Sequence, residues 1–287
     1  MALDGIFLYH LKNEIADFAV DSRVDKVYQP SRDELVISLR SREGSRKLLM
    51  SCNADSARIH FTDYPPENPP KPPMFCLMLR KRLTGAWITS IEQENLERIV
   101  KINLSGTDEL GDKRSYSLII EIMGRYSNII FVDENNKIID SMKRVDENKS
   151  QVREVLPNVT YAAPPAQNKL NIFTDDINEI KQQIMQSNKS LYKAAMDTIK
   201  GVSPIVCREL ENGLSIDDFK MQAQNPVPTL VMLDTPKDFA FIDIKQYDKL
   251  AEIKHYDTFS QLLDYFYYER VRLMLSLIHI SEPTRRS

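Results

Sequence analysis

The 287-residue sequence lacks several features on which common protein classes depend. Its three cysteines are odd in number and widely spaced, so they provide neither a disulfide framework nor a paired metal-binding motif. No run of about 18 uncharged apolar residues occurs, which excludes a transmembrane helix. Charged residues also interrupt the amino terminus, where a signal peptide would have its apolar core. We therefore expect a cytoplasmic protein with no membrane partner.

An excess of charge of one sign is also missing. The 38 Lys and Arg residues oppose 41 Asp and Glu residues, for a formal net charge of −3. No global positive field therefore draws the chain to nucleic acid or to an anionic membrane, and any RNA or DNA contact must be local. Hydrophobic residues make up 42% of the sequence and charged residues 28%, as is typical of folded globular proteins. The length predicts one large domain or two ordinary ones.

The motifs of several enzyme classes are absent as well. None of the four histidines lies in a metal-binding spacing such as HExxH, and no GxSxG, GxGxxG or P-loop string occurs. Zinc proteases, nucleophile-elbow hydrolases, dinucleotide-binding folds and P-loop NTPases thus lack their mechanical parts. Acid pairs such as Glu92 with Glu94 are common in a chain this charged. We expect no enzyme, no metal and no cofactor.

The sequence does contain an α+β pattern. Apolar residues at helical spacing after Asp4 predict an amphipathic helix over residues 5–20. Short alternating runs predict four antiparallel strands between Val24 and Asp63, then a proline-rich connector and a short helix, then five strands over residues 86–142. About nine strands at this spacing are typical of a β-sandwich or barrel.

The second half of the chain changes from strands to helices. Three or four short helices are predicted after a proline-marked linker, then two strands that could return to the β domain, and a long final helix. The predicted division begins with a β domain over residues 1–170 and a helical insert over residues 171–225. Returning strands follow over residues 226–257, then the start of a long helix over residues 258–274 and a tail over residues 275–287.

The tail has an unusual sequence. Leu275 to Arg285 reads LSLIHISEPTR, which is what a common transposon-type sequencing adapter encodes when read in frame. The preceding ERVRLM resembles the middle of a helix. We expect about the last dozen residues to be non-native and the natural chain to continue beyond Met274. The alternative is a natural helix that ends in a polar tail.

Two segments of the β region are candidate binding sites. EIMGRYSNII, residues 121–130, places Gly124 and Arg125 where a simple hairpin would have a shorter polar turn. Either it displays side chains to a partner, or it is a bulged turn with Arg125 in a surface ion pair. The adjacent Glu97 and Arg98, at the start of a strand, are either a site or an ordinary strand-edge pair.

Two further segments could meet a phosphate. IKGVSP, residues 199–204, joins two short helices, and helix-hairpin-helix modules use a glycine-bearing turn of this kind to bring backbone N–H groups to a phosphate. A plain turn capped by Ser203, with Pro204 at the first helical position, fits the same letters. The basic run from Arg80 to Arg82 is either a solvated helix face or a phosphate contact.

Several segments occur in an order that carries a family resemblance: MALDGIFLYHL, VDKVYQP, ARIHFT, ENPPKPPMFCLMLRKRL, ERIVKI, EIMGRYSNIIFVD, REVLPNVTYAAPP and GVSP. Together they resemble the amino-terminal part of the NFACT family, of the bacterial RqcH or fibronectin-binding protein A type, over residues 1 to about 274. The resemblance implies an amino-terminal domain built like that of formamidopyrimidine-type DNA glycosylases, a helix-hairpin-helix region and the start of a coiled coil.

The resemblance also implies a ribosome quality control factor. Such proteins bind a large ribosomal subunit that carries an obstructed nascent chain on peptidyl-tRNA, recruit alanyl-tRNA and promote untemplated alanine tailing, while the ribosome supplies peptidyl transfer. The family's Asp-Arg pair for tRNA recruitment falls on Glu97 and Arg98, with Glu in place of Asp. The EIMGR turn, with Glu121, Met123 and Arg125, is expected against the anticodon arm, because Arg and Glu suit the reading of single-stranded loops.

Further contacts to the nucleic-acid backbone are expected from Arg80, Lys81, Arg82, Lys200 and Gly201. Replacing both Glu97 and Arg98 by alanine is expected to leave folding intact while weakening tRNA binding.

Other functions stay open at this point. They are a cell-surface fibronectin-binding adhesin, a glycosylase-derived nucleic-acid-binding module without catalysis, and a β-domain scaffold with no nucleic-acid partner. A glycosylase activity lacks its nucleophile, a proline amine, because Ala2 and Leu3 follow Met1.

Overall fold

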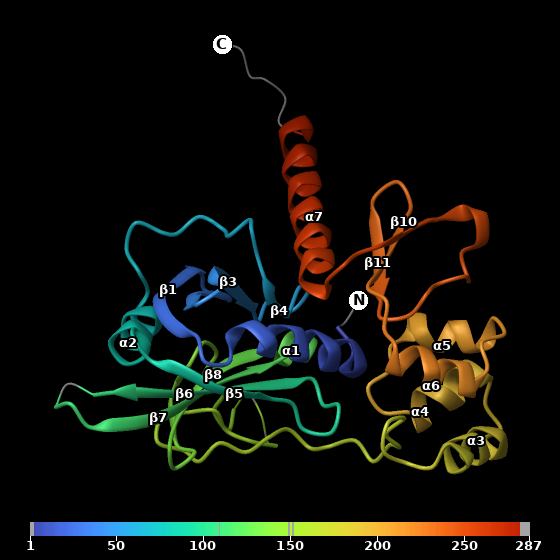
Figure 1. Cartoon of the computed structure of the whole chain (residues 1–287), viewed down its shortest axis with the longest axis horizontal. Coiled ribbons are helices and arrows are strands. Elements are labelled where there is room, and N and C mark those ends of the chain that lie inside the picture. Colours follow the sequence, from blue (N-terminus) through green and yellow to red (C-terminus); the bar gives the residue numbers. More distant parts are fainter. Residues whose placement is uncertain (1–2, 109, 149, 151, 282–287) are drawn as a thin grey trace.

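The computed structural model describes residues 3–108, 110–148, 150 and 152–281. The α+β class is confirmed: a β-rich body lies beside a group of short helices, and one long helix projects from it (Figure 1). Helix α1 (Gly5–Ala19) begins at Asp4, whose carboxylate accepts a hydrogen bond from the backbone N–H of Phe7 at 2.7 Å. Apolar side chains on several of its faces are buried, so α1 lies inside the core rather than on the surface.

All nine strands predicted before residue 142 are present in the described chain. They are β1 (Arg23–Ser31), β2 (Glu34–Ser41), β3 (Gly44–Ser51), β4 (Arg58–Phe61), β5 (Trp87–Glu92), β6 (Ile99–Thr107), β7 (Lys113–Glu121), β8 (Asn128–Asp133) and β9 (Ile138–Ser141). They form one sheet in the order β4-β3-β2-β1-β5-β6-β7-β8-β9. Neighbouring strands are antiparallel, as their short connections and alternating apolar residues predict.

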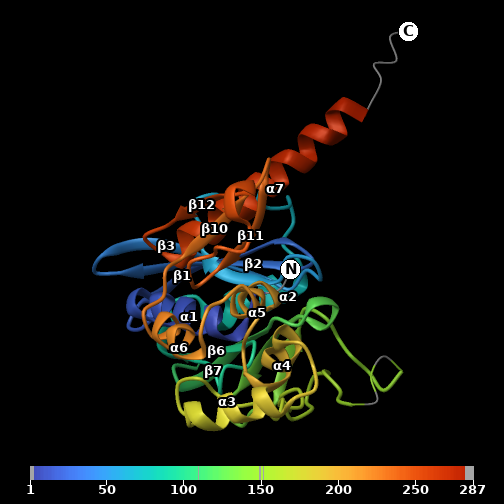
Figure 2. The same ribbon diagram turned by 90° about the vertical axis from the view of Figure 1, so that its right-hand side faces the viewer.

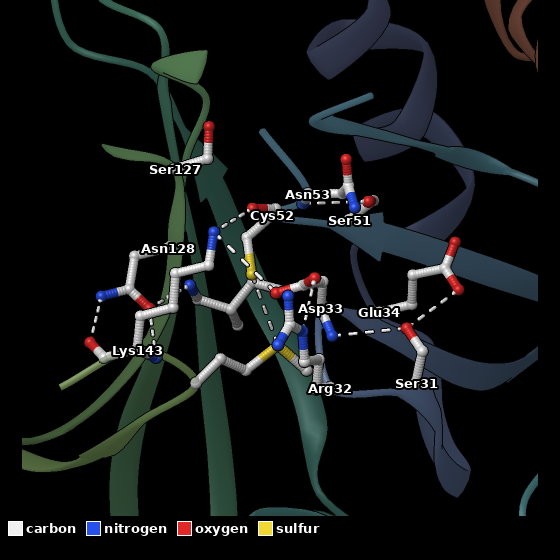
Figure 3. A network of polar contacts seen from close by, with 12 residues as sticks. Ser31, Arg32, Asp33, Glu34, Ser51, Cys52, Asn53, Ser127, Asn128 and Lys143 are labelled. Atoms are coloured by element: carbon white, nitrogen blue, oxygen red, sulfur yellow. Dashed lines mark hydrogen bonds and ion pairs between the residues drawn. The ribbon is translucent and has the colours of Figure 1, made fainter. Parts of the chain in front are cut away.

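The nine-stranded sheet has two halves, which are joined between β1 and β5 and also by the side chain of Lys143. Strands β1 and β5 share one ladder pair, Arg23 with Trp87, and backbone hydrogen bonds on either side of it join the two halves of the sheet. A second link comes from Lys143, which follows β9 and donates from Nζ to the carbonyl of Cys52, between β3 and β4, at 2.5 Å (Figure 3). Its ammonium also lies 3.9 Å from the Asp33 carboxylate. The Lys143 side chain therefore links the chain after β9 to the β3–β4 and β1–β2 connections in the other half of the sheet.

The helices after residue 170 are those that the sequence predicts: α3 (Ile177–Gln186), α4 (Leu191–Thr198), α5 (Pro204–Glu211) and α6 (Ile216–Gln224). Helix α2 (Met74–Leu83) follows the proline-rich connector. Figure 1 shows α2 at one end of the sheet and the α3–α6 group at the other. Two short 3₁₀ turns, η1 (Gly124–Tyr126) and η2 (Asp248–Leu250), complete the helical elements of the described chain.

The strands after the helical insert form a sheet of their own. Strands β10 (Thr229–Met232), β11 (Pro236–Ala240) and β12 (Glu252–His255) pair in the order β11-β10-β12. The predicted segment over residues 226–257 thus has a sheet of its own. Its strands add no pairing to the large sheet and instead pack on the core through side chains such as Phe239, whose ring lies 5.0 Å from that of Phe7. Strand β12 was not predicted, because EIKH is short and has a single apolar residue.

Helix α7 (Phe259–Ser281) is anchored at its base and then leaves the body, on the side away from α3 and α4 (Figure 2). The Glu14 carboxylate accepts from the backbone N–H groups of Phe259 at 2.6 Å and Ser260 at 3.0 Å, and so caps the helix from α1. The helix continues past the predicted boundary at Met274. Residues 282–287 of the predicted tail lie outside the described residues.

Candidate functional site

Three segments that are far apart in sequence meet at the amino-terminal end of α1: the helix end itself, the turn before β6, and the turn between α4 and α5. A Cβ added to Gly5 would lie 2.0 Å from the carbonyl oxygen of Leu96 and 2.9 Å from the Cα of Gly201, so this approach requires glycine at position 5. The backbone N–H of Ile6 donates to the carbonyl of Gly201 at 2.9 Å. Backbone contacts therefore fix the three segments to one another.

The turn before β6 has a strained backbone. Asn95 and Leu96 both have positive φ, 41° and 57°, and the left-handed region disfavours a branched apolar residue such as leucine. The Leu96 side chain is buried in the core, and the Asn171 amide donates to Asn95 Oδ1 at 3.1 Å. Strain of this kind tends to gather at functional sites. Here it sets the direction in which Glu97 and Arg98 leave the turn.

A cavity of about 240 Å³ opens where these segments meet. Its lining includes several residues that the sequence singled out, from two separate regions: Glu97, Arg98, Met123, Lys200 and Gly201. The backbone N–H of Ile122 donates to the carbonyl of Arg98 at 2.8 Å and so extends the β6–β7 ladder by one bond. This bond places the EIMGR turn directly beside the acid–arginine pair.

Lys200 is an internal residue. Its side chain is 3% exposed, and Nζ lies 2.7 Å from Glu97 Oε1 and donates to the carbonyl of Gln167 at 3.3 Å. The prediction that Lys200 contacts a nucleic-acid backbone is therefore wrong, because the ammonium is used inside the fold. The pair also corrects the expected effect of the double alanine variant. Removal of Glu97 would leave the buried Lys200 charge without a carboxylate, which destabilises a fold.

Arg98 is different from its neighbour. Its side chain is half-buried in the wall of the cavity, and within the described chain its guanidinium has no hydrogen bond or ion pair. Asp4 lines the same cavity, and burial raises the pKa of its carboxyl to about 6, opposed by hydrogen bonds from Ser203 and Phe7 and by the charge of Arg98. The cavity therefore presents a guanidinium whose hydrogen-bonding capacity is unused.

The turn between α4 and α5 matches in part the simple capped helix turn that was one of the two interpretations of IKGVSP. Gly201 has φ of 73°, Ser203 is at the N-cap position and Pro204 follows at the first helical position. The Ser203 hydroxyl, however, donates to Asp4 at 2.6 Å instead of accepting from α5. A phosphate contact by Gly201 stays a prediction.

The EIMGR turn contains one buried and one exposed charge. Glu121 is 0% exposed, and its carboxylate is bonded by the Arg153 guanidinium and by the Tyr161 hydroxyl at 2.9 Å. The prediction that Glu121 reads an RNA base directly is therefore wrong. Arg125 is exposed, and it stacks 4.7 Å over the Tyr126 ring rather than forming the surface ion pair considered above.

A larger cleft of about 910 Å³ adjoins the cavity. Met123, Pro164 and Pro165 line both spaces, so the two are neighbours. Arginine, lysine and tyrosine side chains line the cleft together with valines: Arg125, Tyr126, Lys143, Arg144, Val145, Val152, Arg153 and Val155. This mixture of cations, an exposed phenol ring and apolar surface suits a ligand that is both anionic and aromatic.

The basic run of α2 lies elsewhere. A Cβ on Gly106, near the end of β6, would lie 3.2 Å from the carbonyl of Arg82, whereas Arg98 precedes the start of the same strand. At about 3.3 Å per residue the strand separates them by roughly 25 Å. Arg80 donates from Nε to the carbonyl of Val27 at 2.7 Å and so helps to hold α2 on β1. The fold therefore does not bring Arg80, Lys81 and Arg82 to the cavity, and their predicted contacts with a nucleic-acid backbone stay a prediction.

Comparison with known proteins decides the family. Residues 4–273 match the NFACT N-terminal and middle domains. The chain belongs to the NFACT family. This NFACT chain is 33% identical over 282 residues to the Rqc2 homolog RqcH of Bacillus subtilis, an alignment that covers 93% of this chain and 49% of that protein. It is 39% identical over 212 residues to the Rqc2 homolog RqcH of Streptococcus pneumoniae strain D39, covering 74% of this chain and 38% of that protein.

A solved structure has the same fold. The N-terminal part of the fibronectin/fibrinogen-binding protein from Streptococcus suis superposes with a TM-score of 0.81 at 32% identity, over 93% of this chain and 99% of that one. The family resemblance of the sequence is thus confirmed. The NFACT chain spans about half the length, or less, of the curated relatives it matches.

Some residues of the site escaped sequence reasoning. The segment REVLPNVTYAAPP carried the family resemblance, but no role was assigned to its Arg153 and Tyr161. A signal was present in LIIEI, where Glu121 stands among apolar strand residues, since a carboxylate in such a run needs a buried cation. Nothing in the sequence, however, identifies which cation that is.

Two absences concern the described residues alone. None of their helices is both long enough and apolar enough to cross a bilayer. No group of three or more His, Cys, Asp or Glu side chains among them is placed to hold a metal ion.

Proposed function

We propose that this NFACT chain is the tRNA-binding part of a ribosome quality control factor. Membership of the family and the names of its RqcH relatives support the ribosome-associated role. The finer proposal is that the chain binds alanyl-tRNA for untemplated alanine tailing on stalled large ribosomal subunits. In this role it positions tRNA in the cytoplasm, and the ribosome supplies peptidyl transfer.

The observation that carries the proposal is the state of the charges around the cavity and cleft. The two acids of the sequence motifs are satisfied internally, Glu97 by Lys200 and Glu121 by Arg153. Arg98 lines the cavity and Arg125 lines the cleft, and neither has an ion pair within the described chain. A locally cationic surface therefore exists on a chain whose formal net charge is −3.

The chemistry of these groups suits an unpaired RNA loop. A guanidinium can fork onto a phosphate or stack on a base, and Arg98 and Arg125 offer both modes on adjoining surfaces. Tyr126 is 63% exposed and offers a ring on which an unpaired base can stack. The hydrogen bond from Ile122 to the Arg98 carbonyl fixes the backbone of Arg98 before the ligand arrives, which lowers the ordering cost of binding.

The proposal is tested by the RNA that the full chain retains when it is purified from cells at moderate salt. Sequencing of this RNA is expected to show enrichment of alanine tRNAs over other tRNAs, and the enrichment is expected to disappear in Arg98→Ala. Arg82→Ala is the matched control, because it removes a cation far from the cavity. Absence of enriched tRNA from the unaltered chain would contradict the proposal.

A second candidate is favoured by the description of the Streptococcus suis structure, which names a fibronectin/fibrinogen-binding protein. Under this alternative the chain binds immobilised fibronectin or fibrinogen saturably, and Arg98→Ala leaves that binding unchanged. Fibronectin binding without any tRNA binding would favour the adhesin over the translation factor.

A further inference from the structure

The buried ion pair of Glu121 with Arg153 lies at the cleft and binds a segment of irregular backbone over residues 152–165. Glu121 is the last residue of β7, and its carboxylate receives the Arg153 guanidinium and the Tyr161 hydroxyl. Arg153 also donates from Nη1 to the carbonyl of Ala162 at 2.7 Å. The strand end is thus joined to the segment over residues 152–165 at two separate points.

This segment is held by those bonds and by backbone hydrogen bonds near β9, where Ile138 donates to the Val159 carbonyl, Asn158 to the Ile138 carbonyl and Tyr161 to the Asn136 carbonyl. Its described residues form no helix and no strand of the large sheet, and isolated bridges of Val155 with Val145 and of Thr160 with Lys137 supply its pairing. Burial and the nearby Glu121 carboxylate raise the pKa of Tyr161, so its hydroxyl stays a donor at neutral pH. The three side chains therefore form a stable internal connection.

The two walls of the cleft meet at this connection. One wall is the turn that directly follows Glu121 and contains Met123 and Arg125, and the other is the segment over residues 152–165. Pro164 of that segment also lines the cavity beside Arg98. The bonds of Glu121 to Arg153 and Tyr161 therefore tie the two walls to each other at the end of β7.

We infer that Glu121, Arg153 and Tyr161 are positioning residues: they form a lock that sets the width of the cleft and so places Arg125 for RNA. The inference rests on the proposed function. In this role the Glu121 carboxylate touches no RNA, and the Arg153 guanidinium is committed to Glu121 and to the Ala162 carbonyl.

Two mild substitutions weaken the lock and keep most of its side-chain atoms in place. Tyr161→Phe removes one hydrogen bond and keeps the ring. Arg153→Lys keeps the positive charge for Glu121, but a single ammonium lacks the planar fork that reaches Glu121 and the Ala162 carbonyl together. The matched controls lie on β7 itself. Tyr116→Phe alters a ring stacked on Phe131, and Arg114→Lys alters an exposed ion pair at the far end of the strand.

The experiment measures the affinity of the full chain for alanine tRNA at several salt concentrations, together with hydrogen exchange of residues 152–165. Both lock variants are expected to bind about tenfold more weakly, the scale of one charge-assisted hydrogen bond. Exchange in the segment is expected to become faster. The slope of log affinity against log salt is expected to stay unchanged, because no phosphate contact is lost, whereas Arg125→Ala lowers that slope. Both controls are expected to behave as the unaltered chain.

Several outcomes overturn the inference. Wild-type affinity in both lock variants despite faster exchange would show that the cleft width does not matter for RNA. A lower salt slope in Arg153→Lys would show that Arg153 contacts phosphate itself. If the unaltered chain binds no tRNA, the proposed function fails and the RNA-positioning role fails with it, while unchanged exchange in both variants overturns the lock on its own.

Discussion

The Glu97 carboxylate lies 2.7 Å from the ammonium of a lysine that is 3% exposed, whereas the adjacent Arg98 guanidinium has no such partner in the described chain. Because a buried ammonium needs a counter-charge, Glu97 belongs to the fold. Arg98 has no comparable task and is available to a ligand. Neighbours that look like one motif in the sequence thus have separate roles, and their substitutions should separate them.

We expect Glu97→Ala to destabilise the protein and Arg98→Ala to leave its stability nearly unchanged. Breaking a buried pair costs about 3–5 kcal/mol, and the cost here should be toward the low end because Glu97 is 24% exposed. Arg98→Ala should change the free energy of unfolding by about 0.5 kcal/mol or less. Denaturant unfolding of both variants, with Glu97→Gln as an isosteric control, checks this. Equal stabilities for Glu97→Ala and Arg98→Ala would contradict it.

Asp4 should make stability depend on pH in a defined window. Burial raises the pKa of its carboxyl from 3.8 to about 6 in the folded state. Between these values the folded state holds the proton and the unfolded state has lost it. The contribution of Asp4 to stability is therefore greatest below pH about 4 and falls as the pH rises through about 6.

Asp4→Asn removes this titration and keeps a residue that can cap α1. As the pH rises from about 4 to about 7, the unaltered chain should lose free energy of unfolding relative to Asp4→Asn. Urea unfolding at a series of pH values measures this difference and cancels the contribution of other titrating groups. A difference that does not vary with pH would rule out the raised pKa.

At the scale of elements, the amino-terminal end of α1 is the point at which three parts of the chain are joined. Gly5 faces the Leu96 carbonyl and Gly201 across the junction, without the space for a methyl group. The turn before β6, which carries the acid–arginine pair, and the turn between α4 and α5 both depend on this contact for their relative position.

Gly5→Ala should therefore be strongly destabilising although alanine is the better helix former. A Cβ only 2.0 Å from a backbone oxygen forces the segments apart, and we expect a loss of at least about 3 kcal/mol. Gly44→Ala is the control: Gly44 has φ of 127° and open space around it, so the cost should be conformational alone, about 1 kcal/mol. Thermal unfolding of the two variants compares them. A smaller loss for Gly5→Ala than for Gly44→Ala would refute the close contact.

The elements were largely predictable because their signals are local. Alternation of apolar residues located strands such as β7, and helical spacing with caps located α1 and α5. The pairing of Glu97 with Lys200 could not be foreseen in the same way, since it joins a strand end to a helix turn far along the chain. Glu121 shows the same limit: its apolar neighbours indicate burial, but Arg153 as its partner follows only from the tertiary fold.

At the scale of the whole molecule, the cavity lies where the β body meets the helical insert, and the cleft lies beside it on the β body. A ligand that spans both would contact the turn before β6, the EIMGR turn and the segment over residues 152–165. Helix α7 leaves the body on the side away from α3 and α4 (Figure 2), and the basic run of α2 lies at the other end of the sheet (Figure 1). The cationic groups of the cavity and cleft are therefore a local feature of a chain with a formal net charge of −3, separate from the basic run of α2.

The most direct measurement is the affinity of the full chain for alanine tRNA over a range of salt concentrations, for Arg98→Ala beside Arg82→Ala. If the cavity binds RNA, Arg98→Ala should weaken binding by about tenfold or more and reduce the slope of log affinity against log salt by about 1, with stability unchanged. Arg82→Ala should leave both quantities as they are. Equal losses in the two variants, or no loss in Arg98→Ala, would contradict an RNA site at the cavity.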